Sequence, residues 1–110
     1  MPEESSRERS NMQSAITLDE LGTRELAAFD MSARRIAIAK VGDAFYAFAD
    51  TCTHQGCSLA EGTLEGTAVI CPCHGSEFNV ATGEVVRGPA REPVESYAVQ
   101  LEDSTLQVDV

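Results

Sequence analysis

From Ser14 to the C-terminus, apolar side chains occur in short runs that are separated by glycine, aspartate, asparagine and serine. Short apolar runs rich in β-branched and aromatic residues, with such turn residues between them, are typical of β-strands. Residues 36–41 and 44–49 are two such runs, and the Gly42-Asp43 pair between them predicts a hairpin with a two-residue turn. Further strands are expected at residues 25–29, 68–71, 77–80, 84–86, 96–101 and 105–110. Their spacing predicts an all-β domain, folded as a sandwich or a small barrel.

Three segments depart from this pattern. Residues 1–13 are charged, serine-rich and almost free of apolar side chains, so we expect a disordered tail before a domain that spans residues 14–110. Residues 17–26 could offer a helical turn, but Gly22 and the short length argue against a real helix. Residues 50–67 contain three glycines and are expected to form one long loop. Long loops in compact domains usually carry function.

Length and charge limit what this chain can be. A chain of 110 residues has room for one domain with a small core. Its 18 acidic and 8 basic side chains give a formal net charge of −10, so we expect neither nucleic acid nor an anionic membrane surface as a partner, but a protein with a basic docking surface. No run approaches the roughly 20 apolar residues of a membrane-spanning helix, and the first residues are polar, so we expect a cytoplasmic protein.

The candidate metal ligands are concentrated in one part of the chain, because all four cysteines and both histidines lie between Cys52 and His74. They form two motifs, residues 52–54 (Cys-Thr-His) and 71–74 (Cys-Pro-Cys-His). Structural zinc sites place paired ligands two to four residues apart, so the single residue between Cys52 and His54 disfavours one shared tetrahedral ion. Two bridged irons remove the difficulty, since Cys52 and Cys71 can bind one iron while His54 and His74 bind the other. A structural zinc site is the alternative.

The two remaining cysteines, Cys57 and Cys73, lie in the two motif loops, one in each. A disulfide between them would tie the loops together, and closing a segment of about 17 residues contributes roughly 3 kcal/mol of stability in the chain-entropy account. Cytosolic reductants oppose such a bond, so it would have to be shielded. The alternative is a pair of buried free thiols.

Residues 52–57 (Cys-Thr-His-Gln-Gly-Cys) and 71–76 (Cys-Pro-Cys-His-Gly-Ser) closely resemble the two cluster-binding boxes of the Rieske family. Residues 62–66, 78–84 and 88–93 also resemble stretches of that family, so the resemblance covers most of the chain from Thr23 onward. It implies a Rieske fold, with an antiparallel β-sandwich base and a smaller inserted subdomain that binds one [2Fe-2S] cluster. Residues 88–93 would begin with the Gly-Pro loop that shields the cluster.

Position by position, the resemblance implies Cys52 and Cys71 as ligands of the inner iron and His54 and His74 as ligands of the outer iron. It also implies a disulfide between Cys57 and Cys73. Ser76 matches a serine whose hydroxyl donates to a bridging sulfide, although a serine here is also an ordinary turn residue. Phe78 stands where the cytochrome bc type has a tyrosine, which argues against a very high reduction potential.

The expected function is that of a one-electron carrier: a ferredoxin that passes electrons from a reductase to an oxygenase-type acceptor and has no catalytic site of its own. One alternative is a soluble Rieske subunit of a respiratory or molybdenum redox complex, which the disulfide and Ser76 favour. The other is a regulatory domain that uses the cluster for stability and transfers no electrons.

Overall fold

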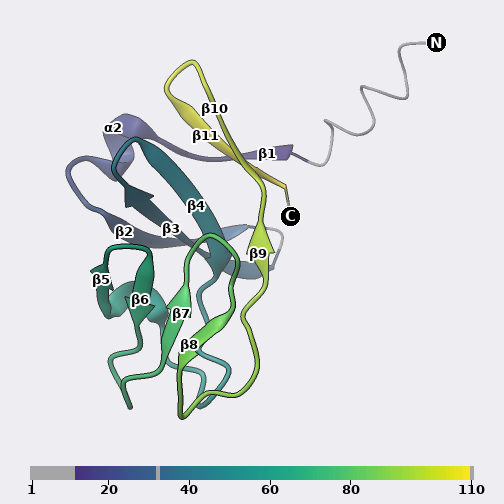
Figure 1. Ribbon diagram of the computed structural model, residues 1–110. Coiled ribbons are helices and arrows are strands. Elements are labelled where there is room, and N and C mark those ends of the chain that lie inside the picture. The colour runs from purple at the N-terminus through teal and green to yellow at the C-terminus, as the bar shows by residue number, and fades with distance from the viewer. Residues whose placement is uncertain (1–11, 32, 110) are drawn as a thin grey trace.

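The computed structural model describes residues 12–31 and 33–109, and the strands of this part of the chain form three antiparallel sheets (Figure 1). The first sheet has the order β1-β11-β10 and contains β1 (Met12–Thr17), β11 (Thr105–Asp109) and β10 (Val99–Glu102). The second has the order β2-β3-β4-β9 and contains β2 (Leu26–Met31), β3 (Arg34–Val41), β4 (Ala44–Ala49) and β9 (Ser96–Tyr97). The third has the order β5-β6-β7-β8 and contains β5 (Thr63–Glu65), β6 (Ala68–Ile70), β7 (Glu77–Asn79) and β8 (Val85–Arg87).

The third sheet is inserted in the chain between β4 and β9 of the second sheet. In Figure 1 its strands and loops lie at the end of the molecule opposite β1, β10 and β11. The first two sheets therefore form the base and the third sheet forms a smaller inserted subdomain, as the resemblance implies. The all-β prediction is confirmed.

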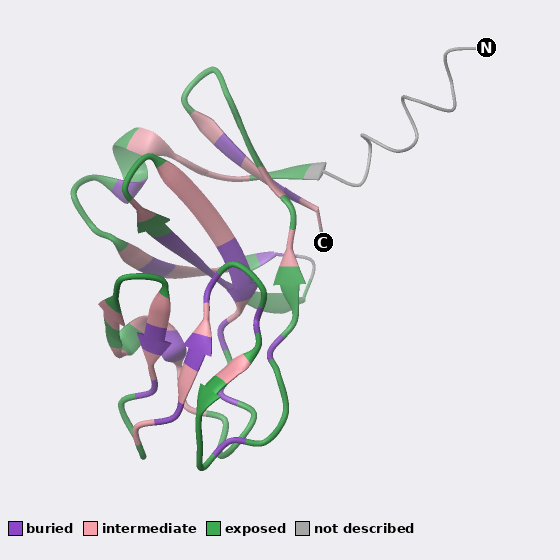
Figure 2. Ribbon diagram, in the orientation of Figure 1, coloured by how far each residue is buried: buried purple, intermediate pink, exposed green. Residues whose placement is uncertain are grey.

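Strand β3 is the centre of the molecule because both of its faces are buried. Ile36 and Ile38 point into one buried cluster, the base core, together with Leu106 and Val108 of β11. The alternate residues of β3, which are alanines, belong to a second cluster, the site core. The site core consists of Ala37, Ala39, Phe48, Cys52, Leu59, Val69, Cys71, Phe78, Val80, Ala90 and Val94. Since successive strand side chains point to opposite faces, the Ile-Ala-Ile-Ala run joins the base to the inserted subdomain. Figure 2 shows these buried residues along β3 and the end of β4.

The predicted hairpin is confirmed, since β3 pairs with β4 up to Val41 opposite Ala44 and Gly42 has a positive φ of 61°. The other predicted strands are present with shifted ends. The run at residues 96–101 is two strands rather than one, because β9 pairs with β4 and β10 pairs with β11, so the chain changes sheet at Ala98. A helix is present as a single turn, α2 (Leu18–Leu21), closed by a capping box between Thr17 and Glu20. Within the described residues, no helix is long and apolar enough to cross a membrane.

The expectation of one unbroken loop at residues 50–67 is wrong. That segment contains the 3₁₀ helix η1 (Leu59–Glu61) and strand β5. Glycines predict a loop here, but Gly62 allows a close approach of two backbone segments, because a Cβ there would overlap the carbonyl oxygen of Ile70 on β6. The base also starts earlier than expected: β1 begins at Met12, and Gln13 pairs with Val108. The remainder of the predicted tail, residues 1–11, lies outside the described residues.

Gly83 binds the segment after β8 to the inserted subdomain through a backbone hydrogen bond. The Gly83 carbonyl accepts a hydrogen bond from the N–H of Val94 at 2.9 Å, and a Cβ at Gly83 would overlap the carbonyl oxygen of Val94. The φ of Gly83 is 83°, in the left-handed region that glycine enters without steric cost. Glycine therefore allows residues 88–94 to return along the subdomain and reach the two cysteine-containing loops.

Candidate metal centre

The two cysteine-containing motifs fold into two loops of equal length, residues 52–57 and 71–76, here called the first and second loops. In the first loop, the N–H of Cys52 donates to the carbonyl of Cys57 at 2.9 Å and the N–H of Gly56 donates to the carbonyl of Cys52 at 2.8 Å. The second loop repeats both bonds at the corresponding residues, from Cys71 to Ser76 at 2.7 Å and from Gly75 to Cys71 at 3.1 Å. The chain thus builds the same closed turn twice, with a cysteine at the start of each.

A glycine occupies the fifth position of both loops because the turn requires a left-handed backbone there. The φ angles are 79° at Gly56 and 81° at Gly75. A residue with a Cβ in this conformation costs roughly 1–2 kcal/mol. The glycines of the two motifs therefore follow from loop closure and do not involve metal chemistry.

The loops direct their thiols inward and their imidazoles outward. Cys52 and Cys71 are free thiols with only 2% and 3% of their surface exposed, and both belong to the site core. His54 and His74 are exposed, and their rings meet edge to face with centroids 5.2 Å apart. The structure thus pairs the two histidines, one from each loop, at the surface above two buried cysteines.

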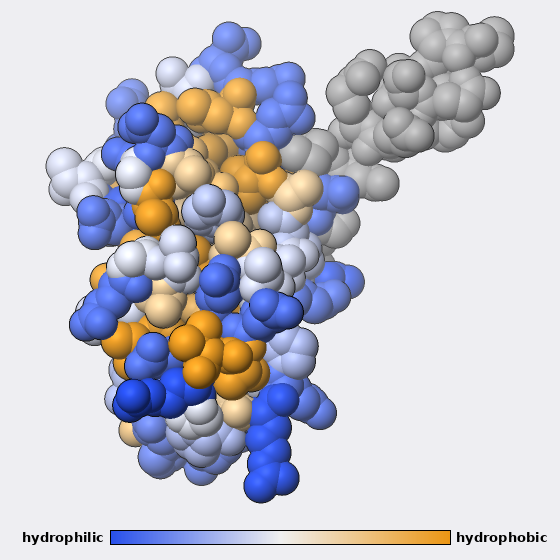
Figure 3. Space-filling model, in the orientation of Figure 1, coloured by the Kyte–Doolittle hydropathy of each residue, from blue (hydrophilic) through white to orange (hydrophobic). Residues whose placement is uncertain are grey.

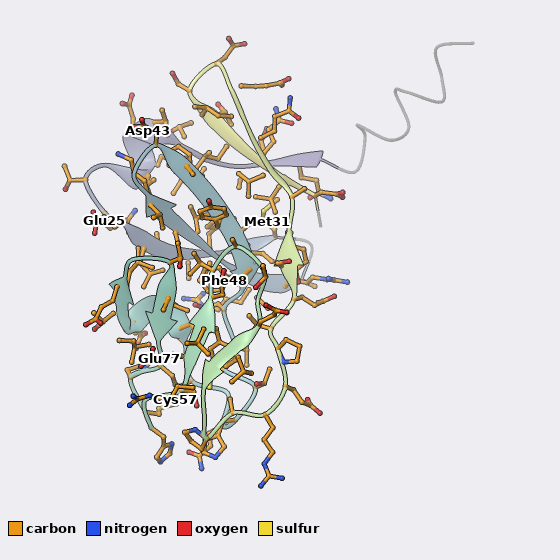
Figure 4. The ribbon with its side chains drawn as sticks, viewed as in Figure 1. Glu25, Met31, Asp43, Phe48, Cys57 and Glu77 are labelled. Atoms are coloured by element: carbon orange, nitrogen blue, oxygen red, sulfur yellow. A yellow bond between two sulfur atoms is a disulfide. The ribbon has the colours of Figure 1, made fainter. Side chains whose placement is uncertain are left out.

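The other two cysteines connect the loops: a disulfide joins Cys57 and Cys73, whose Cα atoms lie 6.5 Å apart. Figure 4 labels Cys57 at the loop end of the molecule, beyond Glu77 of β7. The sulfur atoms of Cys57, Cys71 and Cys73 all lie within 4.8 Å of one another. These three are not a metal-binding set, because a thiolate is the ligand form and the disulfide leaves only Cys71 with a free sulfur.

Ser76 takes the position in the second loop that Cys57 takes in the first. It is fully buried, and its hydroxyl oxygen accepts a hydrogen bond from the N–H of Ala90 at 3.0 Å. A hydroxyl that accepts one bond still has a proton to donate. The contact with Ala90 orients that hydroxyl and holds residues 88–94 against the second loop.

Residues 88–94 also contact the first loop, where the hydroxyl of Thr53 donates to the carbonyl of Glu92 at 2.6 Å. Thr53, His54, Pro89, Arg91 and Glu92 line an open groove of about 480 Å³ beside His54. Sequence reasoning singled out Pro89 but missed Thr53, Arg91 and Glu92. Thr53 stands inside the first motif, yet no local pattern shows that it binds a carbonyl 39 residues away.

The donor chemistry fits a Rieske centre. Two thiolates and two imidazoles are the ligands that distinguish a Rieske [2Fe-2S] cluster from an all-cysteine cluster. Here each loop contributes one buried cysteine and one exposed histidine, so the donors divide by burial as well as by type. A zinc ion also accepts two cysteines and two histidines, so the donors alone do not select the metal.

Comparison with known proteins identifies the metal centre. Residues 11–98 match the family defined as the Rieske [2Fe-2S] domain. The chain is 42% identical over 78 residues to ferredoxin CarAc of Metapseudomonas resinovorans, across 71% of this chain and 73% of that protein. Its structure is similar to the ferredoxin of carbazole 1,9a-dioxygenase from Nocardioides aromaticivorans IC177, with a TM-score of 0.83 and 28% identity over 88% of this chain and 95% of that one. A ferredoxin chain solved in a complex of reduced oxygenase and oxidized ferredoxin in carbazole 1,9a-dioxygenase gives a TM-score of 0.81 and 33% identity, over 89% and 92%.

The chain therefore belongs to the Rieske [2Fe-2S] family, and its cofactor is one [2Fe-2S] cluster. Within that family, the curated relatives it matches include a ferredoxin and ferredoxin components of dioxygenase systems. The predicted family and cofactor are confirmed. The assignment of individual ligands stays a prediction.

Removing the disulfide should weaken the site without removing a ligand. Cys57→Ser, Cys73→Ser and the double variant should all assemble the cluster, yet each should lose about 3 kcal/mol of stability, the loop-closure value for a segment of this length. Thermal melts with iron analysis measure both effects. Because each substitution breaks the same bond, the double variant should have the same melting temperature as the single variants. The unsubstituted protein under strong reductant should have that melting temperature too. Melting temperatures equal to that of the oxidised parent would show that the disulfide contributes no stability.

Proposed function

We propose that Cys52, His54, Cys71 and His74 hold the cluster, and that the chain is a ferredoxin carrying single electrons from a reductase to an oxygenase. The ligand set is supported by the pairing of His54 with His74 at the surface and by the burial of both free cysteines. The ferredoxin role is supported by relatives that are ferredoxin components of dioxygenases.

The proposed ligands lie partly in the interior and partly at the surface. Cys52 and Cys71 would supply two thiolates from within the site core, where water is excluded. His54 and His74 would supply neutral imidazoles at the surface, and replacing thiolates by imidazoles raises the potential of such a centre. When bound, the cluster supplies a one-electron couple.

The exposed pair of histidines is the observation that carries the proposal. Electrons enter or leave most readily where the redox centre comes nearest to the surface, and this is the end of the molecule where His54 and His74 lie. The groove lies beside His54, and on β8 Val86 has 57% of its surface exposed. Figure 3 shows a compact apolar patch over β7 and β8, surrounded by polar residues. An apolar patch with a polar border is typical of a protein docking site.

Charge favours the kind of partner. The formal net charge of −10 attracts a basic surface and repels nucleic acid and anionic lipid. We infer docking on a reductase and an oxygenase through basic surfaces, in the cytoplasm, with no reaction catalysed by this chain itself.

A second candidate is a soluble subunit of a respiratory or molybdenum redox complex, and the Cys57–Cys73 disulfide together with Ser76 favours it. Protein-film voltammetry separates the two. A midpoint potential clearly below zero supports the ferredoxin, and one well above zero supports the respiratory subunit. A regulatory domain that transfers no electrons would behave differently. Its cluster would exchange electrons only slowly with both a reductant and an electron acceptor.

The docking charge can be tested with a basic acceptor of known behaviour, cytochrome c. The chemically reduced protein should reduce cytochrome c quickly at about 50 mM salt and far more slowly at about 500 mM, because salt screens attraction between exposed charges. Stopped-flow absorbance gives both rates. Ferricyanide, an anionic acceptor, serves as control and should react faster as salt rises. Equal salt dependence for the two acceptors would contradict docking by charge.

The ligand assignment predicts the metal content. The purified protein should contain two irons and two acid-labile sulfides per chain, and His54→Ala or His74→Ala should lose the cluster or change its visible spectrum. Gln55→Ala, at an exposed position beside His54, should keep both. One equivalent of zinc without sulfide would refute the cluster assignment, and an unchanged spectrum in a histidine variant would show that this histidine is not a ligand.

Ser76 should tune the potential. If its hydroxyl donates to cluster sulfur, Ser76→Ala should lower the midpoint by about 45–65 mV, the value of a net 1–1.5 kcal/mol hydrogen bond in a one-electron couple. Ser58→Ala removes a comparable hydroxyl, one that bonds to a carboxylate, and should leave the midpoint unchanged. Voltammetry at one pH measures both. A midpoint within about 10 mV of the parent for Ser76→Ala, far below one such bond, would assign Ser76 a purely structural role.

A further inference from the structure

Asp50 is a buried charged residue that the proposed electron transfer does not use. It follows β4 directly, precedes Cys52 by two residues and has only 1% of its surface exposed. A carboxylate in such a place is costly unless donors surround it. The donors around the Asp50 carboxylate therefore indicate the role of this residue.

Three donors from two parts of the chain face the Asp50 carboxylate. From the first loop's far side, the Ser58 hydroxyl donates to Oδ2 at 2.5 Å and the N–H of Ala60 donates to Oδ1 at 2.7 Å. From β3, Arg35 Nε donates to Oδ2 at 3.1 Å. The Asp50 backbone adds two bonds in the same directions, its N–H to the Arg35 carbonyl and its carbonyl to the Leu59 N–H.

These contacts close the base of the first loop. The base of the second loop is closed by a regular ladder, in which Ile70 of β6 pairs with Glu77 of β7. The base of the first loop has only the isolated bridge between Thr51 and Ser58, within the described residues. The Asp50 side chain replaces the missing ladder, because it ties the residues after the loop to the strand before it.

The charge of Asp50 is only partly balanced. Its counterion Arg35 has a half-exposed side chain, 49%, and shares its guanidinium with Asp30 at 3.6 Å. Water therefore screens the cation much more than the buried carboxylate. Two trans peptide units separate Asp50 from Cys52, so their Cα atoms are at most about 7.6 Å apart. At such distances in a partly buried site, a unit charge interacts with another by more than the thermal energy.

We propose that Asp50 is a positioning residue for the first loop and also a fixed negative charge that lowers the reduction potential of the cluster. Adding an electron makes the centre more negative, and a neighbouring buried anion opposes that step. Arg35 acts in the opposite direction by partly neutralising the anion. This inference rests on the proposed function, because it takes Cys52 as a ligand.

The test compares the signs of two potential shifts, measured on the cluster-loaded full chain. Asp50→Asn should raise the midpoint and Arg35→Gln should lower it, although both substitutions should lower the melting temperature. The variant that combines Asp50→Asn with Arg35→Gln should have a midpoint between that of the parent and that of Asp50→Asn, because Arg35 balances Asp50 only in part. Protein-film voltammetry at one pH and one salt concentration gives the midpoints, and a thermal melt with iron analysis gives the stability.

Two matched controls separate charge from structure. Asp30→Asn makes the same chemical change at the exposed carboxylate, 79%, that shares Arg35, and should shift the midpoint much less than Asp50→Asn. Ser58→Ala removes one bond to Asp50 but no charge, so it should lower the melting temperature and leave the midpoint near the parent value.

Shifts of the same sign in Asp50→Asn and Arg35→Gln, or no shift in either, would overturn the electrostatic role and leave Asp50 as a structural residue. If Asp50→Asn does not retain iron, Arg35→Gln decides, because it must still lower the midpoint for the proposal to stand. These measurements need no partner protein. A failure of the ferredoxin proposal would instead appear as slow electron exchange by the unsubstituted protein.

Discussion

The closing of two identical turns against each other is the constraint on which the rest of this structure depends. Each loop is held by the same two backbone hydrogen bonds, and each begins with a buried cysteine and carries an exposed histidine. A two-iron centre with two thiolates and two imidazoles requires both loops at once, since neither supplies more than one ligand of each kind. The disulfide between Cys57 and Cys73 joins the loops through the two cysteines that the proposed ligand set does not use.

Contacts from other parts of the fold hold both loops in place. Hydrogen bonds to the Asp50 carboxylate hold the first loop to the base. The second loop connects the paired strands β6 and β7 directly. Residues 88–94 contact both, through Thr53 to Glu92 and through Ser76 to Ala90. The third sheet is short and its strands have three residues each, so the inserted subdomain depends on these cross-links more than on its own ladders.

The same arrangement explains how a small domain can place a redox centre at its surface. The thiols lie in the site core, which β3 shares with the base through its alanine face. The imidazoles are exposed, on loops of the inserted subdomain, which Figure 1 places at the end of the molecule opposite β1, β10 and β11. Electron exchange then requires a partner only to cover the histidine end, while the base remains free. A strongly acidic chain suits a carrier that must leave one partner for the next, because attraction between exposed charges speeds association more than it slows release.

The sequence by itself determined the family, the cofactor, the β3–β4 hairpin and the identity of the candidate ligands, because those depend on spacing within a few residues. A cysteine and a histidine separated by one or two residues, with a glycine shortly after, can be recognised as candidate ligands without knowledge of the fold. Only the tertiary structure decided which distant groups meet. The bonds from Arg35 to Asp50, from Ala90 to Ser76 and from Thr53 to Glu92 join residues 15, 14 and 39 positions apart. Residues 50–67 show the same limit: glycine predicted a loop there, but Gly62 serves the packing of β5 on β6, which no local pattern contains.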